Sequence, residues 1–143
     1  MSENKKELTG RALVDFAAGQ LFAKKAESLT VMDMRGLSDV ADYYLVATCT
    51  SEAQMRAIIT SLQRNLKKMG VRTLGVEYKS GNRWAVIDAV ELIIHLFEDE
   101  HRTNVDIEKL WGDAKQEELK AENFIIDEDD DEDENDDGSY GYV

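Results

Sequence analysis

The sequence predicts a single α/β (α+β) domain: a mixed sheet of about five strands with helices packed on it. Two segments have the apolar spacing of amphipathic helices, and five shorter ones are rich in β-branched and aromatic residues. The predicted order is helix, two strands, helix, three strands and a short helix. A helix between strands favours a parallel crossover and short connections favour hairpins, so we expect a mixed sheet.

The first helix is expected to run from Thr9, a candidate N-cap, to about Ala26. Its apolar positions share one helical face: Leu13, Phe16, Ala17 and Leu21. Residues 29–34 and 42–49 then have the composition of strands. Gly36 lies between them and can adopt the positive φ that a tight turn requires.

The second helix has clear start and stop signals. Ser51 and Gln54 have the spacing of a capping box, which satisfies backbone N–H groups at a helix start. Apolar residues then recur at helical spacing: Met55, Ile58, Ile59, Leu62, Leu66 and Met69. Lys67 and Lys68 suit the negative end of the helix dipole, and Gly70 suits a left-handed C-terminal cap.

Three further strands are expected at residues 71–78, 83–88 and 91–97. The connections between them, residues 80–82 and 89–90, are short. Short connections join antiparallel neighbours, so this half of the sheet should be antiparallel.

A short helix is expected at residues 105–111, and the polar residues 115–122 are interpreted as its extension. The predicted organisation is a disordered N-terminus at residues 1–7 and one domain at 8–115. Residues 116–143 are expected to form a polar, acidic and largely disordered tail.

Charge is distributed unevenly along the chain. Up to residue 126 there are 20 acids and 17 bases, whereas residues 127–137 contain 10 acids and no base. Proteins bind nucleic acid chiefly by neutralising phosphates with Lys and Arg. The net charge of −13 therefore disfavours primary nucleic-acid binding, and a basic protein is the more plausible direct partner.

Composition and motifs favour a cytoplasmic protein without a cofactor. A single cysteine, Cys49, rules out an internal disulfide, and no apolar run reaches the length of a membrane span. His95 and His101 lack the further ligands of a metal site, and no phosphate-binding or nucleophile motif occurs. We therefore expect no catalytic residue, no cofactor, no metal and no membrane contact.

Alternation along the two adjacent strands places Trp84, Asp88, His95 and Phe97 on one sheet face, and Glu77 is expected to join them. This cluster of aromatic, acidic and imidazole groups is consistent with a docking surface, since Trp is frequent at binding hot spots. It is also consistent with an active-site fragment, although a His and an Asp on paired strands, here His95 and Asp88, more often form a structural hydrogen bond than a catalytic dyad.

Short motifs between residues 29 and 111 follow one another in a distinctive order and spacing. They are Asp33-Met-Arg-Gly36, Ala41-Asp42-Tyr43, Ala47-Thr48, Thr50-Ser51, Gln54, Gly75-Val-Glu77, Trp84, Asp88, His95-Leu-Phe97, Arg102, and Asp106-Ile-Glu108-Lys-Leu110-Trp111-Gly112-Asp113. In this order they resemble the ribosomal silencing factor (Iojap-like) family.

The resemblance implies a fold related to the nucleotidyltransferases but without their catalytic signature. Consistently, Thr48-Cys49-Thr50-Ser51 is not the Gly-Ser phosphate loop of those enzymes. It also implies an activity without turnover. Members bind a large-subunit ribosomal protein on the subunit-joining face, block joining of the small and large subunits, and repress translation when nutrients are limiting.

Carried onto this chain, the resemblance implies a set of partner-binding residues: Asp42, Tyr43, Glu77, Trp84, Asp88, His95 and Phe97. Trp84 is the expected anchor, and Glu77 and Asp88 are expected to meet basic groups of the partner. Two alternatives remain open: a nucleotidyltransferase-like enzyme or nucleotide-binding protein using Asp88, Glu77 and His95, and an acidic chaperone or mimic acting through residues 127–137. A homodimer off the ribosome is compatible with exposed sheet edges.

Overall fold

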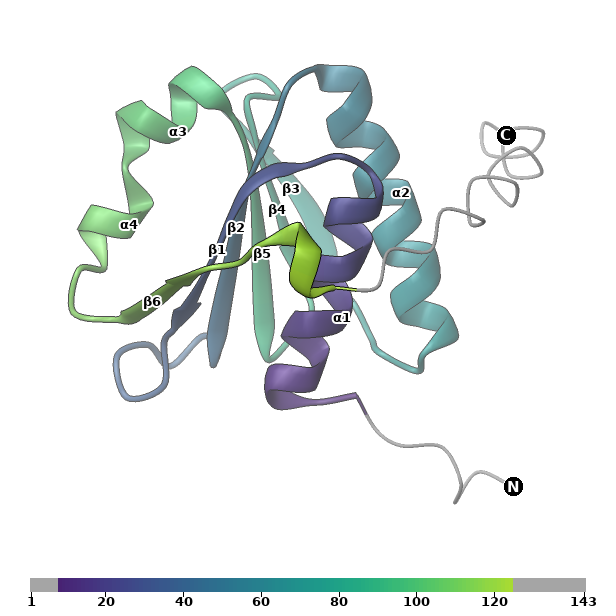
Figure 1. The fold of residues 1–143 in the computed structure, drawn as a ribbon, viewed down its shortest axis with the longest axis vertical. Coiled ribbons are helices and arrows are strands. Elements are labelled where there is room, and N and C mark those ends of the chain that lie inside the picture. The colour runs from purple at the N-terminus through teal and green to yellow at the C-terminus, as the bar shows by residue number, and fades with distance from the viewer. Residues whose placement is uncertain (1–7, 125–143) are drawn as a thin grey trace.

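The computed structural model describes residues 8–124 (Figure 1). Residues 1–7 and 125–143 lie outside the described residues, so the disordered N-terminus and tail stay predictions. Within the described part, no helix is long and apolar enough to cross a membrane.

A six-stranded sheet forms the centre of the domain, in the order β3-β4-β5-β2-β1-β6. The elements are α1 (Gly10–Ala23), β1 (Glu27–Asp33), β2 (Tyr43–Cys49), α2 (Glu52–Lys68), β3 (Gly75–Lys79), β4 (Trp84–Asp88), β5 (Leu92–Glu98), α3 (Asp99–Val105), α4 (Ile107–Leu110), β6 (Lys115–Glu118) and the 3₁₀ helix η2 (Ala121–Asn123). Only the β2–β5 pair is parallel among these strands. The predicted mixed α/β sheet is confirmed, with one strand more than expected.

Local signals account for α2. The Ser51 hydroxyl accepts a hydrogen bond from the backbone N–H of Gln54 at 3.0 Å, which caps the helix as predicted. The Gln54 side chain reaches one residue further back than a capping box requires and accepts from the Thr50 N–H at 2.7 Å. Gly70 follows the helix at φ 81°, a conformation that favours glycine.

The main core lies between the sheet and the two long helices. In Figure 1, α1 and α2 lie together on one side of the sheet. Val14, Leu62, Leu45 and Ile94 are all fully buried there. Because β2 and β5 are central and parallel, they are buried along almost their whole length, which explains their continuous apolar sequences.

The crossover through α2 connects β2 to the far edge of the sheet. β3 runs parallel to β2, as expected, but β4 and β5 lie between them. The antiparallel turns then bring the chain back, so that β5 pairs with β2. The two exposed edges are β3 and β6, and a homodimer through either edge stays a prediction.

The C-terminal part of the domain differs from the expectation. Residues 115–122 do not extend a helix, because β6 pairs with β1 and is followed by η2. Leu119 is buried and Phe124 packs on Phe22 with ring centroids 5.3 Å apart, so structured residues continue past the predicted boundary at 115. β6 is exposed on both faces and therefore carries no apolar periodicity that a sequence pattern would reveal.

Candidate protein-docking face

The two faces of the sheet are covered unequally. Opposite α1 and α2, the short helices α3 and α4 lie against the other face (Figure 1). They pack over residues of β5, β2 and β1, including Phe97, Tyr44 and Met32. The same face of β3 and β4 keeps exposed or half-buried side chains.

Strand register defines which side chains share this uncovered area. Glu77 lies opposite Val86 and Lys79 lies opposite Trp84, and directly opposed residues point to the same side. We name this area the open face; its members are Glu77, Lys79, Trp84, Val86 and Asp88.

Trp84 is held in place by the rings around it. It stacks on Phe97 with ring centroids 4.8 Å apart, and its indole N–H donates to Nδ1 of His95 at 3.1 Å. His101 of α3 contributes a third ring at 6.0 Å, and the Lys79 ammonium lies 5.6 Å from the indole. A half-buried tryptophan fixed by stacking and a hydrogen bond loses little side-chain entropy on binding, which favours a role as an anchor.

His95 supports this tryptophan as a neutral imidazole. Burial, reinforced by the positive charge of Lys79, lowers the pKa of His95 to about 4. Since Nδ1 accepts the indole hydrogen bond, the proton lies on Nε2, which is buried without a hydrogen-bond partner among the described residues. Protonation would place a second hydrogen against the Trp84 N–H, so acid conditions act against this arrangement.

Five of the predicted binding residues lie on the expected face, at two depths. Glu77, Trp84 and Asp88 reach the surface, whereas His95 is 6% exposed and Phe97 is completely buried. The buried pair therefore supports the surface from below and is not itself accessible.

The other two predicted residues lie elsewhere. Tyr43 is buried in the core under α1 and α2, on the opposite side of the sheet, and the Arg35 guanidinium lies 5.2 Å from its ring. Asp42 is exposed before β2, where its backbone N–H donates to the Glu91 carbonyl at 2.8 Å. Neither residue is brought together with Trp84 by this fold.

Lys79 and His101 were missed by the sequence interpretation. Lys79 is two residues beyond Glu77, so the alternation of a strand places it on the same face. His101 was not foreseen because α3, which begins at Asp99, was not among the predicted helices. Its polar sequence carries no helical apolar pattern.

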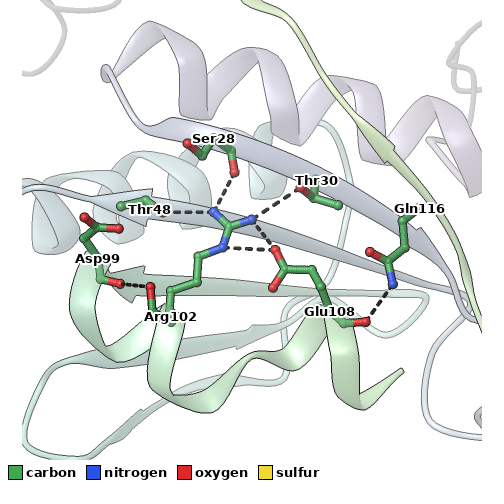
Figure 2. Close-up of polar contacts among 8 residues, drawn as sticks. Ser28, Thr30, Thr48, Asp99, Arg102, Glu108 and Gln116 are labelled. Carbon is green, nitrogen blue, oxygen red and sulfur yellow. Dashed lines mark hydrogen bonds and ion pairs between the residues drawn. The ribbon is translucent and has the colours of Figure 1, made fainter. Parts of the chain in front are cut away.

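An arginine network fixes α3 and α4 on the sheet (Figure 2). The Arg102 side chain, 12% exposed, donates to the Ser28 carbonyl at 2.6 Å and to the Thr48 hydroxyl at 2.9 Å. It also donates to the Thr30 hydroxyl at 3.3 Å and, through Nε, to the Glu108 carboxylate at 3.1 Å. One side chain of α3 thus connects β1, β2 and α4.

Unusual backbone conformations accompany this network. Ser28 has φ 54° where the register of β1 against β2 shifts, and its carbonyl accepts from Arg102. Asp106 has φ 53° and separates α3 from α4, so the single helix expected at 105–111 is two short ones. Gln116 closes the arrangement by donating to the Glu108 carbonyl at 2.8 Å.

A hollow of about 220 Å³ lies where β2 ends and α2 begins. Open α/β sheets commonly bind ligands at the carboxyl ends of their strands. The groups of this hollow do not assemble nucleotidyl transfer chemistry. The Ser51 hydroxyl is used as the helix cap, Asn82 hydrogen-bonds Glu52, and burial raises the pKa of the Cys49 thiol to about 12. Among residues 8–124, no three His, Cys, Asp or Glu side chains are grouped to hold a metal.

Comparison with known proteins decides the family. A family model described as "Ribosomal silencing factor during starvation" matches residues 7–140. The chain belongs to the ribosomal silencing factor family. The resemblance inferred from the motifs between residues 29 and 111 is thereby confirmed.

Relatives of this family cover most of the chain. The ribosomal silencing factor RsfS of Halalkalibacterium halodurans is 32% identical over 114 residues, covering 80% of this chain and 97% of that protein. A mouse protein named mitochondrial assembly of ribosomal large subunit protein 1 is 25% identical, covering 82% of this chain and 57% of its own length. A solved structure from Chromobacterium violaceum matches with a TM-score of 0.68 at 29% identity, covering 71% of this chain and 85% of that one.

Proposed function

We propose that this protein represses translation by occupying the large ribosomal subunit. It binds a ribosomal protein on the subunit-joining face and sterically prevents the small subunit from joining when nutrients are limiting. Membership of the ribosomal silencing factor family supports ribosome association. The mouse relative, whose name refers to assembly of the ribosomal large subunit, supports the choice of that subunit.

The observation that carries the proposal is the position of Trp84 on the open face. Its ring is half-buried and stacked on Phe97, with the Lys79 ammonium 5.6 Å away. The acidic Glu77 and Asp88 lie further along the same face. An aromatic anchor with a polar rim is the usual composition of a protein–protein hot spot. The Glu77 carboxylate lies 3.9 Å from the Lys79 ammonium, so the open face carries two carboxylates and one cation, and this net negative charge suits a basic partner.

The overall charge supports a protein partner over bare RNA. A chain with a net charge of −13 gains little from phosphate contacts, which depend on Lys and Arg. The proposed mechanism is steric, with no turnover of substrate. It uses the open face as a recognition surface and leaves the hollow beside α2 without a chemical role.

The test is a subunit-joining assay with the purified protein and separated ribosomal subunits, followed by gradient sedimentation. The protein should comigrate with the large subunit and reduce the joined particles. Trp84→Ala should weaken binding by about 2 kcal/mol, roughly 30-fold, because it removes the anchor.

Tyr78→Ala is the matched control. Tyr78 is an exposed aromatic on β3, adjacent in sequence to Glu77 but on the opposite side of the strand. The Tyr78→Ala protein should bind the large subunit and inhibit subunit joining as strongly as the parent protein does. A folded Trp84→Ala protein that still binds like the parent would refute the anchor, and a protein that ignores both subunits would refute the function itself.

A further inference from the structure

The exposed side of α2 and the loop after it form the most basic surface segment of the chain. Residues 53–76 contain five bases and no acid. Lys67, Lys68 and Arg72 are exposed where the helix ends. This composition is the opposite of residues 127–137, which contain ten acids and no base.

A groove of about 940 Å³ adjoins the end of α2. Its lining includes Ala23 of α1, Lys68 of α2, the helix C-cap Met69, and Leu119 and Phe124 from the C-terminal part of the domain. Met69 is 39% exposed, so the groove presents apolar surface beside the cationic end of α2. Asp15, Glu117 and Glu118 also line it, so the excess of positive charge lies on α2 and the residues after it, not in the groove itself.

The described chain ends beside this groove. Phe124 packs on Phe22 at 5.3 Å and also lines the groove. The acidic segment begins three residues later, within roughly 10 Å of extended chain. Eleven extended residues span up to about 38 Å, whereas the 17 residues of α2 extend about 25 Å. The segment is therefore close enough and long enough to follow the helix.

We propose that residues 127–137 dock on the basic outward side of α2 and the loop after it, as an intramolecular polyanion that competes with RNA phosphates for this surface. The proposal goes beyond ribosome silencing and does not depend on the open face. Single exposed ion pairs are weak, but tethering gives the acidic segment an effective concentration of about 1 mM. Consequently, the basic residues of α2 are neutralised by the chain itself, and contacts with the ribosome are directed to other surfaces.

Zero-length carbodiimide crosslinking of the full chain tests the docking, because it joins lysine amines to carboxylates in direct contact. Crosslinks from residues 127–137 should concentrate on Lys67, Lys68 and Lys120, and should disappear at about 1 M salt, where the screening length is about 3 Å. Lys79 and Lys109 are the matched controls, since both are exposed outside the helix-covered side.

Crosslinking an equal mixture of ¹⁵N-labelled and unlabelled chains identifies the occupant. Crosslinks within one isotope class support docking within the chain. Crosslinks that join the two classes mean that the acidic segment reaches a second copy, which overturns the proposal. If Lys79 and Lys109 are crosslinked as strongly as Lys67, Lys68 and Lys120, no site is preferred, and the proposal is overturned as well.

Competition with RNA is tested by a full-length variant in which the ten acids of residues 127–137 become Asn or Gln. It should bind a structureless single-stranded RNA about tenfold more tightly at low salt, the factor expected if a millimolar effective concentration competes with an affinity near 0.1 mM. Unchanged RNA affinity would exclude competition.

Charge reversals then separate competition from net charge. Added to the neutral-tail variant, Lys67→Glu with Lys68→Glu should abolish the gain in RNA affinity. Lys79→Glu with Lys109→Glu changes the net charge by the same amount and should preserve most of the gain in RNA affinity. If both pairs abolish the gain to the same extent, net charge alone explains it, and the site on α2 is refuted.

Discussion

The two faces of the sheet differ in side-chain composition and in how completely helices cover them. Under α1 and α2, the side chains are aliphatic and completely buried, with Leu62 and Ile94 as examples. On the opposite face, Trp84, His95 and Tyr44 are joined by ring contacts and hydrogen bonds, and cover by α3 and α4 is partial. The difference indicates that the first face provides stability, while the second gives up some burial to keep a tryptophan accessible.

Truncation of the helix-covered core should produce the largest loss of stability. Leu62→Ala removes a fully buried side chain of α2 and should lower the free energy of unfolding by about 2–5 kcal/mol. Urea unfolding measures this change. The folded fraction should bind ribosomal subunits like the parent, and a selective loss of binding would contradict the division of labour between the faces.

Acid should destabilise the opposite face through His95. Its pKa is about 4 in the folded protein and near 6.5 when unfolded, so the unfolded chain binds the extra proton first as pH falls. Above about pH 6.5 this group costs no stability. As the pH falls to about 4, the free energy of unfolding decreases, and the loss reaches about 3 kcal/mol. Urea unfolding between pH 4 and 7 measures it, and His95→Phe should flatten the profile; equal slopes in both proteins would exclude His95 as the cause.

Substitution of Arg102 tests whether this side chain holds α3 and α4 on the sheet. Arg102→Gln removes the charge that connects Glu108 to β1 and β2, and should cost about 1–3 kcal/mol of unfolding free energy. Hydrogen exchange should accelerate first in α3 and α4. Arg35→Gln is the control, since its ion pair with Asp33 is exposed and should matter much less; uniform acceleration over the whole sheet would contradict a local role.

The smallest expected effect is at the start of α2. Ser51→Ala removes the cap on the Gln54 N–H and should lower stability by about 1 kcal/mol, measurable by urea unfolding. Ser51→Asp should retain it, because a carboxylate also accepts this hydrogen bond. Large losses in both variants would point to a role for Ser51 other than capping.

The elements with local signals were predictable from sequence. The capping pattern and apolar spacing place α2 within two residues of its observed bounds, and alternation places Trp84, Asp88, His95 and Phe97 on one face. The short connection at residues 89–90 was also predicted, but the backbone conformation of Val90 was not. Its φ of 71° is unusual for a β-branched residue, and it is supported by a hydrogen bond from the Val90 N–H to Asp88 at 2.9 Å.

Features that depend on distant contacts were not predictable. β6 is a polar strand whose only reason to be extended is its pairing with β1, more than 80 residues earlier. α3 is fixed by Arg102 reaching Ser28 and Thr48, and this cover is what buries His95 and Phe97. The degree of burial of the predicted site residues therefore could not be predicted without the tertiary structure.

The parallel β2–β5 pairing also sets the order in which the chain acquires its shape during synthesis. Residues 43–49 have no permanent neighbour on one side until residues 92–98 have been made, and this late closure gives the centre of the sheet a high contact order. Trp84 gains its stacking partner Phe97 in the same step. A nascent chain therefore cannot present the finished open face until nearly all of the domain has left the ribosome that is translating it.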